Sequence, residues 1–167
     1  MTGVPEGLFA PPGADWQRVS PALARLRRTV LVVSLGVTAL VVVVVGLGFA
    51  LPIWTWVTAL VVVAVLAVWG WWLVGRNAER WGYAERDEEL FITSGALFRR
   101  LVVVPYGRMQ YVDVQAGPLD RAYGLAKIQL HTAAPGTSAH IPGLPADEAA
   151  RLRDRLTAAG EAQAAGL

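Results

Sequence analysis

Two adjoining stretches decide the fold of this chain. Residues 29–51 read TVLVVSLGVTALVVVVVGLGFAL and residues 53–74 read IWTWVTALVVVAVLAVWGWWLV, with no charged side chain in either. A helix needs about 20 apolar residues to cross roughly 30 Å of hydrocarbon. Because lipid offers no hydrogen-bond partner to an open backbone, each stretch is predicted to form a transmembrane helix despite its many valines.

Two other interpretations of these stretches are less satisfactory. Two buried helices of a soluble protein would leave a small domain with no polar face on either helix. A secretory signal peptide has an apolar segment shorter than residues 29–51 and needs a cleavage site of small residues, which does not precede the second stretch. We therefore expect a membrane protein with two spans.

The residues that flank the two stretches predict their orientation. Pro52 alone separates them, and Trp54 and Trp56 beside it suit the headgroup level, so the helices should form a tight hairpin. Arginines flank the outer ends of both stretches, at Arg25, Arg27, Arg28, Arg76 and Arg80. Since basic flanks stay on the cytoplasmic side, we expect both termini to be cytoplasmic at the cell membrane.

The charges outside the hairpin exclude one class of partner. The isoelectric point is near 9.4. However, four arginines and two acidic residues precede residue 29, which leaves 11 of the 15 basic and 11 of the 13 acidic residues from Arg76 onward. A neutral domain has little electrostatic attraction to a phosphate backbone, so we expect no nucleic-acid partner. The absence of cysteine fits a reducing compartment.

The apolar pattern changes after residue 80 from a helical period to the period of two that strands show. Strands are expected at 81–85, 89–93, 97–104, 108–116, 127–132 and 140–142. A helix is expected at 146–159, because Ala149, Leu152 and Leu156 recur at helical spacing behind an acidic first turn. Strands followed by one helix predict a small antiparallel barrel or sandwich closed by a capping helix.

These patterns predict an α+β membrane protein of four parts. The parts are a cytoplasmic tail with a short interfacial helix (1–28), a transmembrane hairpin (29–76), an antiparallel β domain (81–159) and a disordered tail (160–167). Proline and glycine in the first 19 residues favour disorder there, and Ser20-Pro21 reads as the start of a helix.

Several segments of the β domain carry a family resemblance. They read DEELFI at 87–92, GALFRR at 95–100, VPYGRMQYV at 104–112, GPLDRAYGL at 117–125 and HTA at 131–133. Together they resemble the bacterial pleckstrin-homology (PH) domain of YdbS-like membrane proteins, with Met109 where isoleucine is more usual. The resemblance implies a PH-like β fold on the inner face of the membrane and implies little about chemistry.

No arrangement of side chains predicts catalysis. His131 and His140 are the two histidines, and neither forms a ligand cluster with Asp113 or Asp120 at the spacing of metal sites. A nucleophile, a base and an orienting group cannot all be named. We therefore expect no enzyme activity, no catalytic residue, no metal site and no cofactor.

The candidate contact residues are arginines at turns. Arg108 follows Pro105-Tyr106-Gly107, where a turn would aim its guanidinium at a carboxylate or a phosphate; a structural salt bridge is the alternative role. Arg121 lies in the glycine-bounded loop 117–124. Tyr106, Arg108 and Arg121 are thus the predicted binding surface, while Arg99 and Arg100 are predicted to face anionic headgroups.

Two functions follow from these expectations. The favoured one is a membrane-tethered cytoplasmic interaction module that docks a partner protein or another copy of this chain, because tethering supplies a high effective concentration. The alternative is a module that binds anionic phospholipid weakly at the inner leaflet. The neutral charge of the domain argues against strong headgroup binding.

Overall fold

The structure, a computed structural model, describes residues 13–132 and 139–166. The chain forms two compact units. One unit is Ala24–Arg76, and the other joins Met1–Leu23 to Asn77–Leu167. The larger unit is therefore built from two segments that lie on either side of the smaller one in the sequence.

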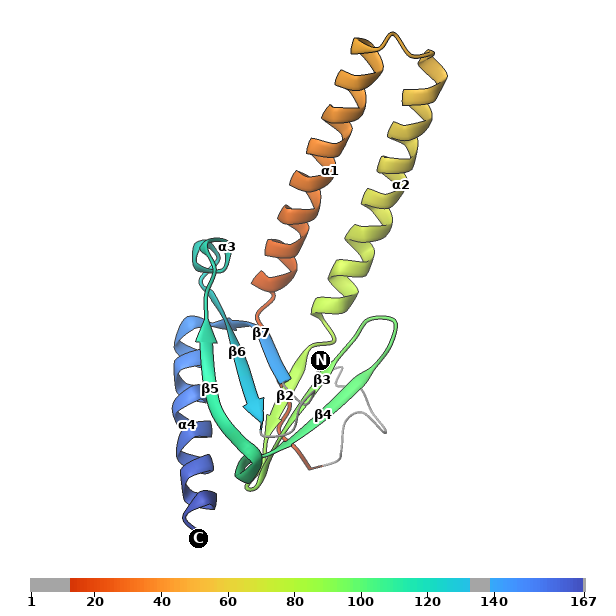
Figure 1. Ribbon diagram of the computed structural model, residues 1–167. Coiled ribbons are helices and arrows are strands. Elements are labelled where there is room, and N and C mark those ends of the chain that lie inside the picture. Colours follow the sequence, from red (N-terminus) through yellow and green to blue (C-terminus); the bar gives the residue numbers. More distant parts are fainter. Residues whose placement is uncertain (1–12, 133–138, 167) are drawn as a thin grey trace. The chain divides into compact units, whose positions relative to one another are not determined.

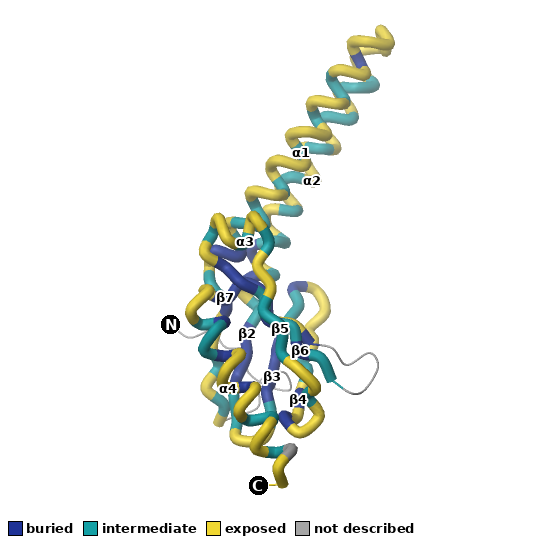
Figure 2. The backbone as a smooth tube through the Cα atoms, turned by 60° about the vertical axis from the view of Figure 1, so that its left-hand side comes forward, coloured by how far each residue is buried: buried dark blue, intermediate teal, exposed yellow. Residues whose placement is uncertain are grey.

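The smaller unit is a pair of long helices. They belong to α1 (Ala22–Gly48) and α2 (Ile53–Ala78), and both are long and apolar enough to cross a membrane. Their apolar side chains are mostly exposed, whereas burial is concentrated in the strands (Figure 2). The hydroxyl groups of both helices donate to backbone carbonyls of the preceding turn, at Thr29, Ser34, Thr38, Thr55 and Thr58. This self-satisfaction of polar groups is what a lipid environment requires.

The larger unit is a domain of two antiparallel sheets and one long helix (Figure 1). The first sheet has the order β1 (Gln17–Arg18), β2 (Gly82–Glu85), β3 (Glu89–Ser94), β4 (Arg100–Pro105). The second has the order β5 (Met109–Gln115), β6 (Leu125–Thr132), β7 (Ala139–Pro145). A short turn of 3₁₀ helix, η1 (Tyr106–Arg108), joins the sheets, and α3 (Pro118–Ala122) joins β5 to β6. The last element is α4 (Ala146–Ala164).

The core of this domain follows the predicted alternation. Ile128 and Leu130 of β6 are fully buried, as the period of two predicts. The apolar stripe of α4 is buried as well, at Ala149, Leu152 and Leu156. The predicted antiparallel fold with a capping helix is therefore confirmed.

In the sequence, the membrane hairpin separates the first strand from the other strands of its sheet. β1 precedes α1 in the chain, yet it pairs with β2, which follows α2, with Arg18 opposite Gly82. Val19 and Leu23 are also buried in the domain. Leu23 packs against Gly143, which has φ of 70° and leaves no room for a Cβ, because that atom would lie 2.7 Å from Leu23 Cβ. The hairpin is thus an insertion between β1 and β2.

Two predicted boundaries are wrong. The tail and interfacial helix expected at 1–28 contain β1 and the buried Leu23, while residues 1–12 lie outside the described part. The reason is that the partner of β1 is more than 60 residues away in sequence, so local composition does not reveal it. At the other end, α4 continues to Ala164 instead of ending at 159. Gln163 accepts a hydrogen bond from the Gly107 amide (2.6 Å), which holds the last turn.

The loop expected at 117–124 is also more regular than predicted. It contains α3, whose start is capped by Asp120, because the Asp120 carboxylate accepts a hydrogen bond from the Gly117 amide (3.0 Å). The strand expected at 140–142 is longer as well and spans β7.

A polar network ties β1, β2 and α4 together. Arg151 of α4 pairs with Glu85 (2.9 Å) and with Glu148 (2.6 Å). The Tyr83 hydroxyl donates to Glu148 (2.6 Å) and lies 2.6 Å from Gln17 Oε1. The hydrogen bond from Arg151 lowers the pKa of Glu148, while burial and Glu148 raise the pKa of Tyr83. The network therefore favours a charged Glu148 and a neutral Tyr83.

Prediction: the domain can be rebuilt without the hairpin, provided that β1 is kept. Residues 13–23 joined through a flexible Gly/Ser linker to 77–166 should be more stable than 77–166 alone by about 3–6 kcal/mol, since burial of Val19 and Leu23 contributes about 1.5–3 kcal/mol each. Urea unfolding followed by circular dichroism measures the difference. As a control, Leu23→Ala should cost the joined protein about 2–5 kcal/mol. Equal midpoints with and without 13–23 would contradict the assignment of β1.

Prediction: Glu148→Gln destabilises the protein at neutral pH and makes its stability less sensitive to acid. The Glu148 pKa is lowered from its ordinary 4.5, so its contribution is complete above that pH and is lost as the pH falls through the lower, folded-state value. The thermal unfolding temperatures of the solubilised full chain and of its Glu148→Gln variant should differ at pH 7 and become equal in acid. Asp154→Asn, at an exposed carboxylate paired only with its neighbour Arg153 among the described residues, is the matched control. A difference that stays constant with pH would refute the role of the Glu148 charge.

Candidate functional site

Tyr106, the first of the predicted contact residues, is a core residue. Its side chain is only 4% exposed, and its amide donates to the Glu88 carbonyl (3.0 Å). Burial and the negative charge of Glu85 raise the pKa of its hydroxyl. Tyr106 therefore fixes the η1 turn from inside, and a partner has little of it to contact.

Arg108 is exposed at the end of the same turn. It immediately precedes Met109, the first residue of β5, which pairs with Thr132 at the end of β6. The neighbouring Gly107 is held by Gln163 of α4. Among the described residues, no acidic side chain forms an ion pair with Arg108. A fixed turn with an outward arginine is suited to contact an external acceptor.

Arg121 lies at the opposite end of the same strands. It is exposed on α3, which follows Gln115 at the far end of β5. Seven residues of strand separate the two arginines, which corresponds to about 20 Å. The structure therefore does not bring Arg108 and Arg121 into one surface. Arg99 and Arg100 are exposed at the β3–β4 connection, again away from Arg108.

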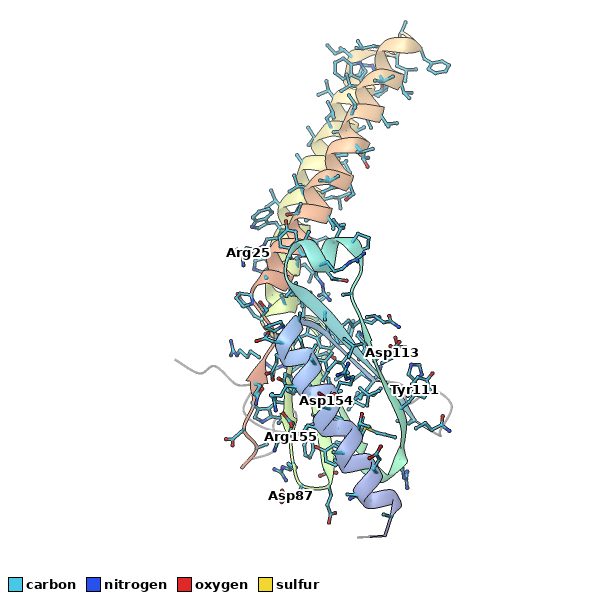
Figure 3. All side chains as sticks on the ribbon, turned by 90° about the vertical axis from the view of Figure 1, so that its left-hand side faces the viewer. Arg25, Asp87, Tyr111, Asp113, Asp154 and Arg155 are labelled. Atoms are coloured by element: carbon cyan, nitrogen blue, oxygen red, sulfur yellow. The ribbon has the colours of Figure 1, made fainter. Side chains whose placement is uncertain are left out.

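A groove between β5 and α4 is the feature that the sequence analysis missed. It has a volume of about 210 Å³ and is lined by Met109, Gln110, Tyr111, Val112, Leu156, Thr157, Gly160 and Glu161. The two elements run side by side, with Tyr111 and Asp113 on β5 and Asp154 and Arg155 on α4 (Figure 3). Most of the lining is uncharged, and Glu161 is its one charged residue. Gly160, on the stripe of Leu156, is the sequence signal that a hollow lies here.

Strand β5 leaves one edge open along this groove. Among the described strands it pairs with β6 alone, so its other row of backbone groups has no strand partner there. Tyr111 is 57% exposed and stacks on His131 with the ring centres 4.2 Å apart. An open strand edge beside an exposed aromatic can accept an added strand.

A second hollow lies on the other side of α4 and is ionic. It has a volume of about 250 Å³ and is lined by Glu85, Arg86, Asp87, Tyr106, Arg155, Leu156 and Ala159. Glu85 is already engaged by Arg151 and by Arg155 (3.3 Å). Because its carboxylate is committed to these contacts, this hollow serves the fold, and the β5–α4 groove is the better candidate site.

The histidines take part in ring contacts. His131 stacks on Tyr111, and His140 lies 5.2 Å from the ring of Trp81. Within residues 13–132 and 139–166, no group of three or more histidine and acidic side chains could hold a metal ion.

Comparison with known proteins agrees with this architecture. The bacterial PH domain family matches residues 28–160, well over half of the chain. The chain is similar to the UPF0699 transmembrane protein YdbS of Bacillus subtilis (strain 168), with 42% identity over 77 residues, 46% of this chain. That match spans about half of the relative, 47% of its length. No solved structure matches the chain.

These matches settle the class of protein. The relative's name describes a transmembrane protein, in agreement with the two apolar helices, so this chain is a membrane protein. Neither description names an enzymatic activity. The chain belongs to the bacterial PH domain family, as a member whose PH-like domain carries a membrane hairpin between its first two strands.

Proposed function

We propose that this membrane-anchored PH-like domain docks an extended segment of a partner protein in the β5–α4 groove. The observation that carries the proposal is the edge of β5 without a strand partner, beside a groove whose lining is uncharged except for Glu161. A segment added there would form backbone hydrogen bonds with β5 and place one apolar side chain in the groove. Arg108, at the groove's end, would bind an acidic group of that segment.

The choice of occupant rests on the chemistry of the groove. Its interior is lined by Met109, Val112 and Leu156, which favour an apolar side chain. Arg108, beside the groove, forms no ion pair among the described residues, so an acidic group on the partner segment would complement it.

The proposed side of the membrane is the cytoplasm. Arg25, Arg27, Arg28, Arg76 and Arg80 flank the outer ends of the two helices, and no basic residue lies between 49 and 56. The positive-inside rule therefore favours a cytoplasmic domain. Anchoring would keep the groove at high effective concentration toward partners in the same membrane.

Prediction: a photo-crosslinking amino acid at position 111 forms a crosslink, in native membranes, to a protein other than this chain. At Val103, which is 42% exposed on the edge strand β4 of the other sheet, the same amino acid should capture far less. Arg108→Ala should reduce the yield at 111 by about tenfold, the loss expected for a charge-assisted hydrogen bond. Arg108→Lys should retain part of it.

The fold provides the control for this experiment. Arg108 is exposed, so its substitution should leave the thermal unfolding of the chain unchanged within about 0.5 kcal/mol. A crosslinked product of twice this chain's mass would show that a second copy of this chain, and not a partner protein, occupies the groove. Equal yields at 111 and 103, or a yield insensitive to Arg108→Ala, would exclude the groove as the docking site.

Prediction: the domain faces the cytoplasm and the hairpin turn faces out. The chain has no cysteine, so single cysteines can be introduced at Pro52 and Asp87. A membrane-impermeant thiol reagent added to intact cells should label position 52 and should reach position 87 only after the cells are opened. The reverse pattern would show that the arginine flanks do not set the orientation.

A further inference from the structure

Exposed apolar side chains of the PH-like domain gather on two loops. Outside residues 24–76, five large apolar side chains of the described chain are exposed: Leu97, Phe98, Val103, Tyr111 and Leu119. Three of them lie on two loops, the β3–β4 tip (95–100) and α3. Phe98 is 88% exposed, the highest value among them. Such concentration of apolar surface marks a contact surface.

Strand register places the β3–β4 tip at the end of the domain where the chain departs and returns. Arg18, at the end of β1, pairs with Gly82, at the start of β2. Gly82 is level with Thr93, and Thr93 pairs with Leu101, so residues 95–100 extend beyond this end of the sheet.

The register of the second sheet places α3 at the same end. Gln115 pairs with Lys127 and Leu125 pairs with Pro145, so α3 lies where β7 finishes. Gly143, near that end of β7, accepts a hydrogen bond from the Ser20 amide (2.9 Å), which leads into α1. The two loops therefore share one end of the domain (Figure 1).

At this end, only short segments of chain connect the domain to the two uncharged stretches. Thr29, where the uncharged stretch begins, is six positions after Leu23, and Arg80 is six positions after Val74. As helix, six residues span about 9 Å. Arg80 also braces the tip, because its guanidinium donates to the Ala96 carbonyl (3.4 Å).

The β3–β4 tip is built to project its side chains. Gly95 has φ of 108°, and a Cβ there would collide with the Phe98 carbonyl oxygen. The resulting tight turn leaves Leu97, Phe98, Arg99 and Arg100 all exposed. Leu97 and Phe98 therefore point away from the core.

The two loops that carry the exposed apolar side chains also carry exposed positive charge. Arg99, Arg100 and Arg121 are exposed on the two loops, and the nearby Asp120 carboxylate is engaged by the Gly117 amide. The β2–β3 turn at the opposite end exposes Asp87 and Glu88. The two loops thus present positive charge at the end of the domain where the chain enters lipid.

We infer that the β3–β4 tip and α3 form a lipid-contacting rim that immerses Leu97, Phe98 and Leu119 in the headgroup region of the membrane that anchors the chain. Arg99, Arg100 and Arg121 contact lipid phosphates beside them. The rim is independent of the β5–α4 groove, which ends near Arg108 at the other end of β5. It holds the domain at three points: the hairpin and the two loops.

The test uses the full chain in vesicles of phosphatidylcholine and phosphatidylglycerol. An environment-sensitive fluorophore on Leu97→Cys, and separately on Leu119→Cys, should be quenched by nitroxide lipids several-fold more than the same fluorophore on Asp87→Cys. Phe98→Ser should lower quenching at position 97, and Arg99→Gln with Arg100→Gln should lower it further. Tyr111→Ser, an exposed aromatic away from the rim, should leave it unchanged.

Two results would overturn the rim. One is equal quenching at positions 97, 119 and 87, and the other is quenching at 97 that Phe98→Ser does not change. Because Phe98 is almost fully exposed, its substitution leaves the fold intact. Crosslinking from position 111 probes the groove separately, so failure of the rim and failure of partner docking are distinguishable.

Discussion

The pairing of β1 with β2 is the contact on which the rest of the structure depends. It brings Arg18 and Gly82 side by side although the whole membrane hairpin lies between them in the sequence. The burial of Leu23 against Gly143 reinforces the closure from the second sheet. As a result the chain leaves the domain for α1 and returns from α2 at the same end of the first sheet. Each described loop of the domain lies either at that end or at the opposite one.

Much of this architecture could be predicted from the sequence, because the deciding signals are local. Two uncharged stretches identify the hairpin, and alternation at Ile128 and Leu130 identifies a half-buried strand. The stripe of Ala149, Leu152 and Leu156 identifies the capping helix. Each signal lies within one short segment of the sequence. It can therefore be recognised without knowing which segment packs against it in the fold.

The remainder could not be predicted because it depends on distant partners. Gln17 and Arg18 have no apolar pattern of their own and become a strand only beside β2. Tyr106 and Arg108 are two residues apart at one turn, yet one is buried and the other exposed. Arg121 is an arginine near a glycine, as Arg108 is, but strand β5 separates the two. The groove is formed by two elements that meet only in the folded domain.

The insertion of the hairpin also orders the biogenesis of the protein in time. A ribosome makes β1 first, then both membrane helices, and only afterwards β2 and the rest of the sheet. Since β1 has no partner until β2 emerges, the domain cannot close before the hairpin has been synthesised. A chain whose second helix failed to enter the membrane would have β1 and the other three strands of its sheet on opposite sides of the bilayer. Pairing of β1 with β2 therefore requires the two strands to be on the same side of the membrane, which insertion of both helices achieves.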